Sequence, residues 1–250
     1  MNRLAIVRPK GFGAIQKLNW CRLVVLFLVA SFLTACGQRH IPQEITALHL
    51  PPKSLPPSKH EIIIVDAGHG GKDAGASSKR EKYEEKALTL ETAFLISNYL
   101  EQIGYKTILT RSHDIYVPLH TRAEIANATD ADLFVSIHYN YSSSQEAEGI
   151  EVYYYKEEKT PPSLRITKSK ELGQEVLKKV IKNTGAESRG VKQANFAVVR
   201  QTKMPAILIE AGFLSNPKER AKLYNQKYLH SLAKGIANGV DQYIIQNSNY

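Results

Sequence analysis

The pattern of apolar residues after residue 60 alternates between short continuous runs and longer runs with helical spacing. A run of β-branched residues such as Ile62–Val65 is typical of a strand buried on both faces, and apolar residues three or four positions apart predict an amphipathic helix. We expect strands at Ile62–Asp66, Lys106–Arg111, Leu133–His138, Ile150–Tyr155, Phe196–Arg200 and Ala206–Glu210. We expect helices at Glu84–Ile103, Leu119–Ala128, Ser163–Lys182, Pro217–Tyr224 and Gln226–Ile245.

This alternation of strands and helices predicts an α/β fold with a largely parallel sheet. The strand at Ile150–Tyr155 follows the strand at Leu133–His138 without a helix between them, so one part of the sheet is expected to be antiparallel. We therefore expect a three-layer sandwich in which a roughly six-stranded, mixed and mainly parallel sheet is flanked by helices.

The first 35 residues have a different character. They carry five basic and no acidic side chains, and their apolar run, Leu23–Leu33, is shorter than the about 20 residues that span a bilayer. This is typical of a secretory signal. The segment Leu33-Thr34-Ala35-Cys36-Gly37 resembles the lipobox of bacterial lipoproteins, which implies a signal peptide over residues 1–35 and a lipid on Cys36. An uncleaved signal anchor is the alternative.

Residues 36–60 hold five of the eleven prolines of the chain. Such a segment favours extended conformations and forms no core, so we expect a proline-rich tether between the membrane and a domain over residues 61–250. The lipobox implies a location in the cell envelope, lipid-anchored and facing the periplasm. Because Gly37 and not Asp follows Cys36, the sorting rule for such lipoproteins favours the outer membrane in a Gram-negative cell.

The net charge of +9 at first suggests an anionic partner. More than half of this excess lies in residues 1–35, so we expect no nucleic-acid binding and only mild attraction to an anionic wall or membrane. The two cysteines, Cys21 and Cys36, both precede the domain. A metal in the domain must therefore be held by His, Asp or Glu.

Three of the expected strands are followed by, or end in, a residue whose side chain can bind a metal or exchange a proton. His69 follows the strand at Ile62–Asp66 after a glycine turn, whereas His138 and Glu210 end their own strands. The carboxyl ends of parallel strands meet at one edge of a sheet, which is where ligands bind in open α/β folds. Two histidines and one carboxylate form a frequent catalytic zinc set, and a further carboxylate can act as general base. The spacing alone does not say which carboxylate has which role.

Several longer motifs follow one another between Ile62 and Tyr243: VDAGHGGKDAGA at Val65–Ala76, Glu85-Lys86 at a helix start, SIHYN at Ser136–Asn140, and the segment Arg189–Asn216. Their order resembles that of the zinc-dependent N-acetylmuramoyl-L-alanine amidases of amidase type 3, which cleave peptidoglycan. The resemblance implies zinc ligands at His69, Glu85 and His138, and Glu210 as the catalytic carboxylate. It also implies hydrolysis of the amide between the lactyl group of N-acetylmuramic acid and L-alanine, in wall remodelling or daughter-cell separation.

Two assignments leave alternatives open. Glu84 and Glu85 both precede Lys86; Glu85 keeps the register of the helix, and Glu84 is then an acid that complements the helix dipole. Asn140, just after His138, is a candidate for substrate binding. Arg111 and Arg122 are expected to pair with acids within the fold.

Two other functions fit the same residues. A zinc peptidase or carboxypeptidase would cut between amino acids of the stem peptide, and a wall-binding lipoprotein would have lost catalysis. Only about 50 residues separate His138 from Arg189, which leaves little room for the long inhibitory helix of some division-associated relatives. We therefore expect that the site needs no obligatory activator. We also expect the protein to be a monomer.

Overall fold

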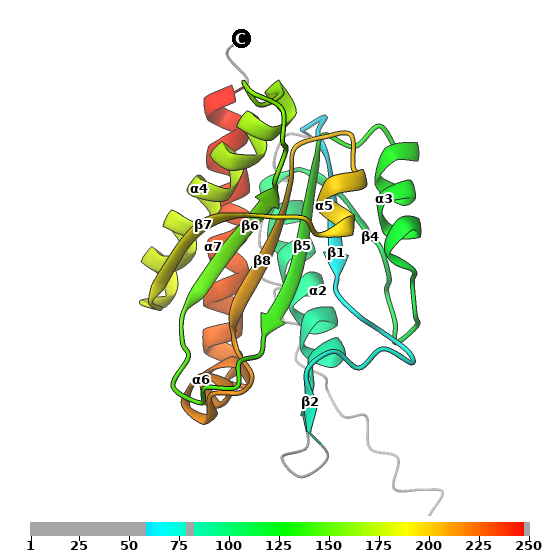
Figure 1. Ribbon diagram of the computed structural model, residues 1–250. Helices are drawn as coiled ribbons and strands as arrows, with labels where there is room; N and C mark the ends of the chain where they lie inside the picture. Colours follow the sequence, from blue (N-terminus) through cyan, green and yellow to red (C-terminus); the bar gives the residue numbers. More distant parts are fainter. Residues whose placement is uncertain (1–58, 79–82, 248–250) are drawn as a thin grey trace, which may run out of the picture. The chain divides into compact units, whose positions relative to one another are not determined.

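The computed structural model describes residues 59–78 and 83–247 (Figure 1). The predicted signal peptide, Cys36 and all of the tether except its last two residues lie outside this part. Within the described residues, no helix has both the length and the apolar character needed to cross a membrane.

The strands are β1 (Ile62–Ala67), β2 (Ser77–Ser78), β3 (Tyr83–Glu84), β4 (Lys106–Leu109), β5 (Leu133–Asn140), β6 (Ile150–Tyr155), β7 (Ser188–Ala194) and β8 (Ala206–Phe213). The helices are α2 (Glu85–Ile103), α3 (Leu119–Ala128), α4 (Leu164–Thr184), α5 (Ala197–Gln201), α6 (Pro217–Leu223) and α7 (Gln226–Asn247).

Six of these strands form one mixed sheet in the order β4-β1-β5-β8-β6-β7, and β2 pairs with β3 in a small antiparallel ladder. Strands β4, β1, β5 and β8 run parallel to one another. Strand β6 is antiparallel to β8 and parallel to β7, so the last two strands run the other way. The expected mixed and mainly parallel α/β sheet is confirmed.

Each face of the sheet has its own core. Helices α2, α4 and α7 cover one face over a large cluster of buried apolar side chains, whereas α3 and α5 lie on the other face (Figure 1). The smaller cluster on that second face includes Ile64, Phe134, Val198 and Leu208. Because α3 and α5 are short, no described helix covers the second face beyond them, at the carboxyl ends of β1, β5 and β8.

One predicted strand is wrong. The sequence pattern predicts a strand at Phe196–Arg200, but Ala197–Gln201 is the helix α5, and the remaining strand of the sheet is β7 at Ser188–Ala194. A short apolar run such as Ala197–Val199 fits one helical turn as well as a strand. Strand β7 lies at the edge of the sheet and is partly exposed, so it lacks a continuous apolar run.

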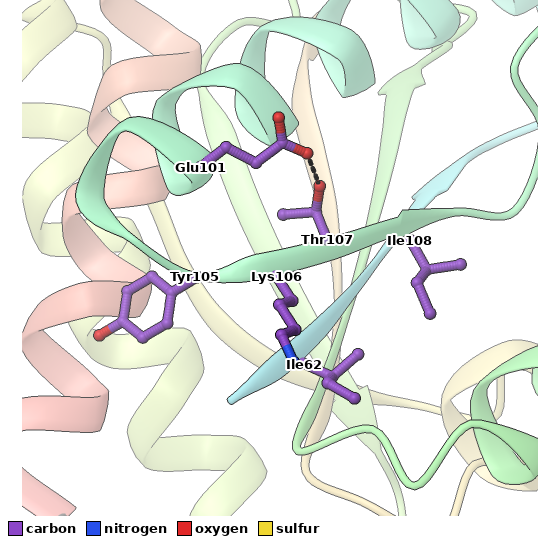
Figure 2. Close-up of a pocket in the computed structure, with 6 residues that line it drawn as sticks. All are labelled: Ile62, Glu101, Tyr105, Lys106, Thr107 and Ile108. Carbon is purple, nitrogen blue, oxygen red and sulfur yellow. Dashed lines mark hydrogen bonds between the residues drawn. The ribbon is translucent and has the colours of Figure 1, made fainter. Parts of the chain in front are cut away.

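A cavity of about 440 Å³ lies beside edge strand β4 and the amino-terminal end of β1 (Figure 2). Its one carboxylate, Glu101, already accepts hydrogen bonds from Ser97 and Thr107. This cavity is at the end of the strands remote from the histidines, and one oxygen of Glu101, Oε1, accepts both of these hydrogen bonds.

Candidate metal centre

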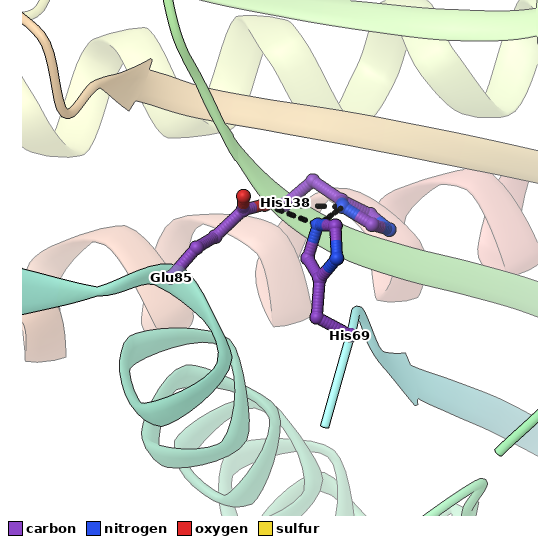
Figure 3. Close-up of side chains that lie close together, drawn as sticks. All are labelled: His69, Glu85 and His138. Carbon is purple, nitrogen blue, oxygen red and sulfur yellow. Dashed lines mark hydrogen bonds and ion pairs between the residues drawn. The ribbon is translucent and has the colours of Figure 1, made fainter. Parts of the chain in front are cut away.

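Three predicted ligands come together at the carboxyl ends of β1 and β5 (Figure 3). His69 follows β1, His138 lies in β5, and Glu85 is the first residue of α2. Glu85 Oε1 lies 3.0 Å from His69 Nε2 and 3.1 Å from His138 Nδ1. One ligand atom from each of the three residues lies within 4.8 Å of the others, which is close enough to share one ion.

The carboxylate of Glu85 is held by backbone amides on both sides. Oε2 accepts from the N–H of Ala76 at 2.8 Å, and Oε1 accepts from the N–H of Tyr139 at 3.0 Å. The side chain of Glu84, by contrast, is 53% exposed and lies 3.5 Å from Lys86 Nζ. The structure therefore brings Glu85 to the histidines and leaves Glu84 at the surface.

His69 is fixed in an unusual backbone conformation. Its φ of +60° is rare for a residue with a β-carbon and is found where surrounding contacts impose it. Its Nδ1 lies 2.9 Å from Asp73 Oδ2, and this contact turns Nε2 towards Glu85. A carboxylate behind a histidine in this way is typical of metal sites, where it fixes the ring and raises its basicity.

A buried ion pair supports the loop that carries His69. Asp66 accepts from Arg122 Nη1 at 2.7 Å, and both side chains are buried. Burial disfavours the ionised form of Asp66, but the charge of Arg122 and the hydrogen bonds outweigh it and lower the pKa. Arg122 also donates to the carbonyl oxygen of His69 at 2.6 Å. The expectation that Arg122 pairs with an acid is confirmed, whereas Arg111 donates to the carbonyls of Ala67 and Gly68.

The charges of the cluster favour a cation. Burial disfavours protonation of His69, but the carboxylates of Glu85 and Asp73 outweigh this effect and raise its pKa to about 9. Burial likewise disfavours ionisation of Glu85, but the two histidines outweigh it and hold its pKa well below its usual range. A carboxylate between two imidazoles therefore stabilises positive charge at this point. The donor set of two His nitrogens and one carboxylate oxygen fits Zn²⁺.

Glu210 lies directly beside this cluster. It is the partner of His138 in the parallel pairing of β5 and β8. Its Oε2 atom is buried and has no hydrogen-bond partner among the described residues. Burial, opposed by the charge of His138, raises the pKa of Glu210 to about 7. A buried carboxyl with a free oxygen and a pKa near neutrality is suited to general acid–base chemistry.

A cleft of about 490 Å³ opens over the cluster, on the sheet face of α3 and α5. Its lining includes the three candidate ligands, Glu210 and three exposed apolar side chains, Leu119, Tyr141 and Phe196. Asn140, the predicted substrate-binding residue, also lines it. The amide of Asn140 is committed on both sides: Nδ2 donates to Glu151 Oε1 at 2.6 Å, and Oδ1 accepts from the N–H of Tyr141.

The sequence reasoning missed the charged group next to Glu210. Glu151, which is 3% exposed, binds Asn140, Arg189 and Lys192. Strand β6 runs opposite to β8, so Glu151 reaches this edge from the start of a strand. Glu151 is therefore not among the residues that follow or end an expected strand. Its position in the sequence, as an acidic residue between the apolar residues Ile150 and Val152 of an expected strand, is the feature that could have indicated a special role.

Comparison with known proteins identifies the family of the chain. The family model described as N-acetylmuramoyl-L-alanine amidase matches residues 63–242. The chain belongs to this family. The predicted membership of amidase type 3, an enzyme family that acts on the cell wall, is thus confirmed.

Several relatives are similar over the same region. The uncharacterized protein YqiI of Bacillus subtilis is 33% identical over 202 residues, which cover 80% of this chain and 94% of YqiI. The probable cell wall amidase LytH of Staphylococcus epidermidis is 35% identical over 75% of this chain, which spans 60% of the length of LytH.

Solved structures of the family have the same fold. The catalytic domain of CwlV, an N-acetylmuramoyl-L-alanine amidase of Paenibacillus polymyxa, is 36% identical with a TM-score of 0.68 and covers 74% of this chain and 98% of its own. An N-acetylmuramoyl-L-alanine amidase of Clostridium difficile 630 is 38% identical with a TM-score of 0.69, over 76% of this chain and 98% of its own.

Proposed function

We propose that this protein is a zinc-dependent N-acetylmuramoyl-L-alanine amidase of peptidoglycan. It hydrolyses the amide between the lactyl group of N-acetylmuramic acid and L-alanine of the stem peptide, in wall remodelling or daughter-cell separation. The observation that carries the proposal is the free, buried oxygen of Glu210 next to the cluster of His69, Glu85 and His138.

His69, Glu85 and His138 would hold the ion. Zinc, when bound, supplies Lewis acidity, which makes water a better nucleophile at neutral pH and polarises an amide carbonyl. Glu210, in its ionised form, takes a proton from the attacking water at Oε2. It then gives this proton to the amide nitrogen as the carbon–nitrogen bond breaks. The products are a lactyl carboxylate on the sugar and a free amino group on L-alanine.

The site is proposed to work without an activator. Helix α4, which connects β6 to β7 in the sequence, packs on the face of the sheet opposite the cleft. The segment in which an inhibitory helix would be inserted is therefore occupied by a helix of the core. We also propose that the protein acts as a monomer on the periplasmic side, tethered by a lipid on Cys36.

Mass spectrometry of digestion products tests this function. The full chain, purified in detergent, is incubated with peptidoglycan sacculi, with and without a chelator. The amidase releases intact stem peptides with a free L-alanine amino group, and the chelator stops the release. Shortened stem peptides on intact muramic acid would instead support the peptidase alternative, and no soluble product would support the inactive wall-binding one.

A further inference from the structure

Four ionisable side chains form a row across four neighbouring strands. His138 of β5 pairs with Glu210 of β8, and Glu210 pairs on its other side with Glu151 of β6. Lys192 of β7 then binds Glu151. Directly opposed residues of neighbouring strands project to the same face, so Glu210 has a histidine on one side and a second carboxylate on the other.

The two carboxylates of this row have very different surroundings. Glu151 Oε2 accepts hydrogen bonds from Arg189 Nε at 3.3 Å and from Lys192 Nζ. Glu151 Oε1 accepts from Asn140 at 2.6 Å. Glu210 Oε2, one strand away, has no hydrogen-bond partner among the described residues. Both nearby cations are thus attached to one carboxylate of the pair.

Lys192 has room for another arrangement, because its side chain is 39% exposed and its aliphatic stem is flexible. Arg189 is held more firmly, since it also donates to the carbonyl oxygen of Glu148 at 3.2 Å and lies over the ring of Phe213. Opposed residues of adjacent strands have β-carbons about 4.5–5.5 Å apart, so a lysine released from Glu151 has Glu210 as the next carboxylate of the row. An ion pair with Lys192 would occupy the oxygen that Glu210 needs for proton transfer.

Resting on the proposed function, we propose that Glu151 is a positioning residue for the reaction. It attracts Lys192 and Arg189 to itself and so keeps the carboxylate of Glu210 free. Its bond to Asn140 also joins the two strands on either side of β8, which fixes the cleft wall above Glu210. Glu151 itself exchanges no proton with the substrate.

The activity test uses four variants with zinc content measured in each. Glu151→Gln keeps the shape but removes the charge, so Lys192 is released and kcat is expected to fall about tenfold or more with little change in KM. The double variant E151Q/K192M removes the released cation and is expected to regain much of that loss. The matched double variant E151Q/K170M, which removes an exposed lysine of α4, is expected to stay as slow as E151Q.

Glu151→Asp keeps the negative charge and is the control that separates loss of the charge from loss of folding. It is expected to retain most of the activity. Wild-type kcat in E151Q, no recovery in E151Q/K192M, or an E151D variant as slow as E151Q would each overturn the proposal. A loss caused only by poor folding would appear in all the Glu151 variants alike, and Lys192→Met would not correct it.

A crystal structure of the E151Q chain gives a measurement independent of hydrolysis. We expect Lys192 Nζ within hydrogen-bond distance of a Glu210 oxygen. A Lys192 that stays away from Glu210 would overturn the positioning role even if the wild type proves to be an amidase. Conversely, if the wild type releases no stem peptide, the proposed function fails, while the position of Lys192 still decides how Glu151 acts on its neighbour.

Discussion

A β-carbon on Gly75 would lie 2.5 Å from Oε2 of Glu85, a separation that packed atoms do not tolerate. The same β-carbon would lie 2.7 Å from Cδ2 of His69. Gly75 also has a φ of +66°, in the left-handed region that favours glycine. The backbone at this position therefore lies against two of the three candidate ligands.

Gly75→Ala is expected to displace Glu85 and His69 and to weaken zinc binding about tenfold to a hundredfold. Gly185→Ala is the matched control, because Gly185 has the same φ of +66° but a β-carbon added there would have no neighbouring atom within 4 Å. Both variants carry a backbone strain of about 1–2 kcal/mol. Competition titration with a chromogenic chelator measures the affinity, and equal zinc affinity in the two variants would contradict the packing argument.

Glu210→Gln is expected to bind zinc normally and to lose about a hundredfold or more in turnover, because the amide cannot accept the proton of water. His138→Ala is expected to lose both zinc and activity. Metal analysis and mass spectrometry of the released muropeptides distinguish the two cases. An E210Q variant with full activity would exclude Glu210 as the general base.

Glu210, whose Oε2 is buried, is also expected to lower stability at neutral pH. Its pKa of about 7 is above the ordinary 4.5, so the folded state binds more protons than the unfolded state between these values. Stability therefore falls as pH rises from about 4.5 to 7, and by linkage the cost is up to about 3 kcal/mol.

In metal-free protein, E210Q is accordingly expected to be more stable than the wild type at pH 8 and equal to it near pH 4. Urea unfolding in a chelating buffer measures the difference. The chelator matters because a bound cation would favour the charged form of Glu210 and mask the effect. A stability difference that does not change with pH would contradict the assignment of the raised pKa to Glu210.

Arg122→Met is expected to reduce the free energy of unfolding by about 3–5 kcal/mol, because it leaves the buried carboxylate of Asp66 without its charged partner. It also removes the donor to the carbonyl of His69, so zinc affinity should fall in the protein that still folds. Arg200→Met is the control, since Arg200 binds an exposed Asn195 side chain and its loss should cost less than about 0.5 kcal/mol. Equal costs in the two variants would contradict the prediction.

The sheet and most of the residues of the candidate metal centre can be predicted from the sequence. His69, His138 and Glu210 follow or end continuous apolar runs, and parallel strands bring such positions to one edge. Glu85 is predicted only through the resemblance to a family, because a glutamate at the start of a helix has no local pattern that separates it from a capping acid. The contacts that hold its carboxylate beside the histidines, with the N–H groups of Ala76 and Tyr139, belong to the folded structure.

The errors have physical causes as well. The segment at Ala197–Val199 is too short for its apolar pattern to distinguish a helix from a strand. Strand β7 is an edge strand whose pairing with β6 is invisible without the partner. An antiparallel strand at Ile150–Tyr155 is expected from the sequence, but its register with β8, which places Glu151 opposite Glu210, is a property of the assembled sheet.

The spacing of the candidate ligands along the chain has a consequence for how the protein matures. His138 lies 69 residues from His69 and 53 residues from Glu85, so the ring of donors closes only after β5 has added to β1. The donor set is therefore a product of the assembled sheet, and in the proposed enzyme an ion would cross-link β1, α2 and β5 only after they have come together.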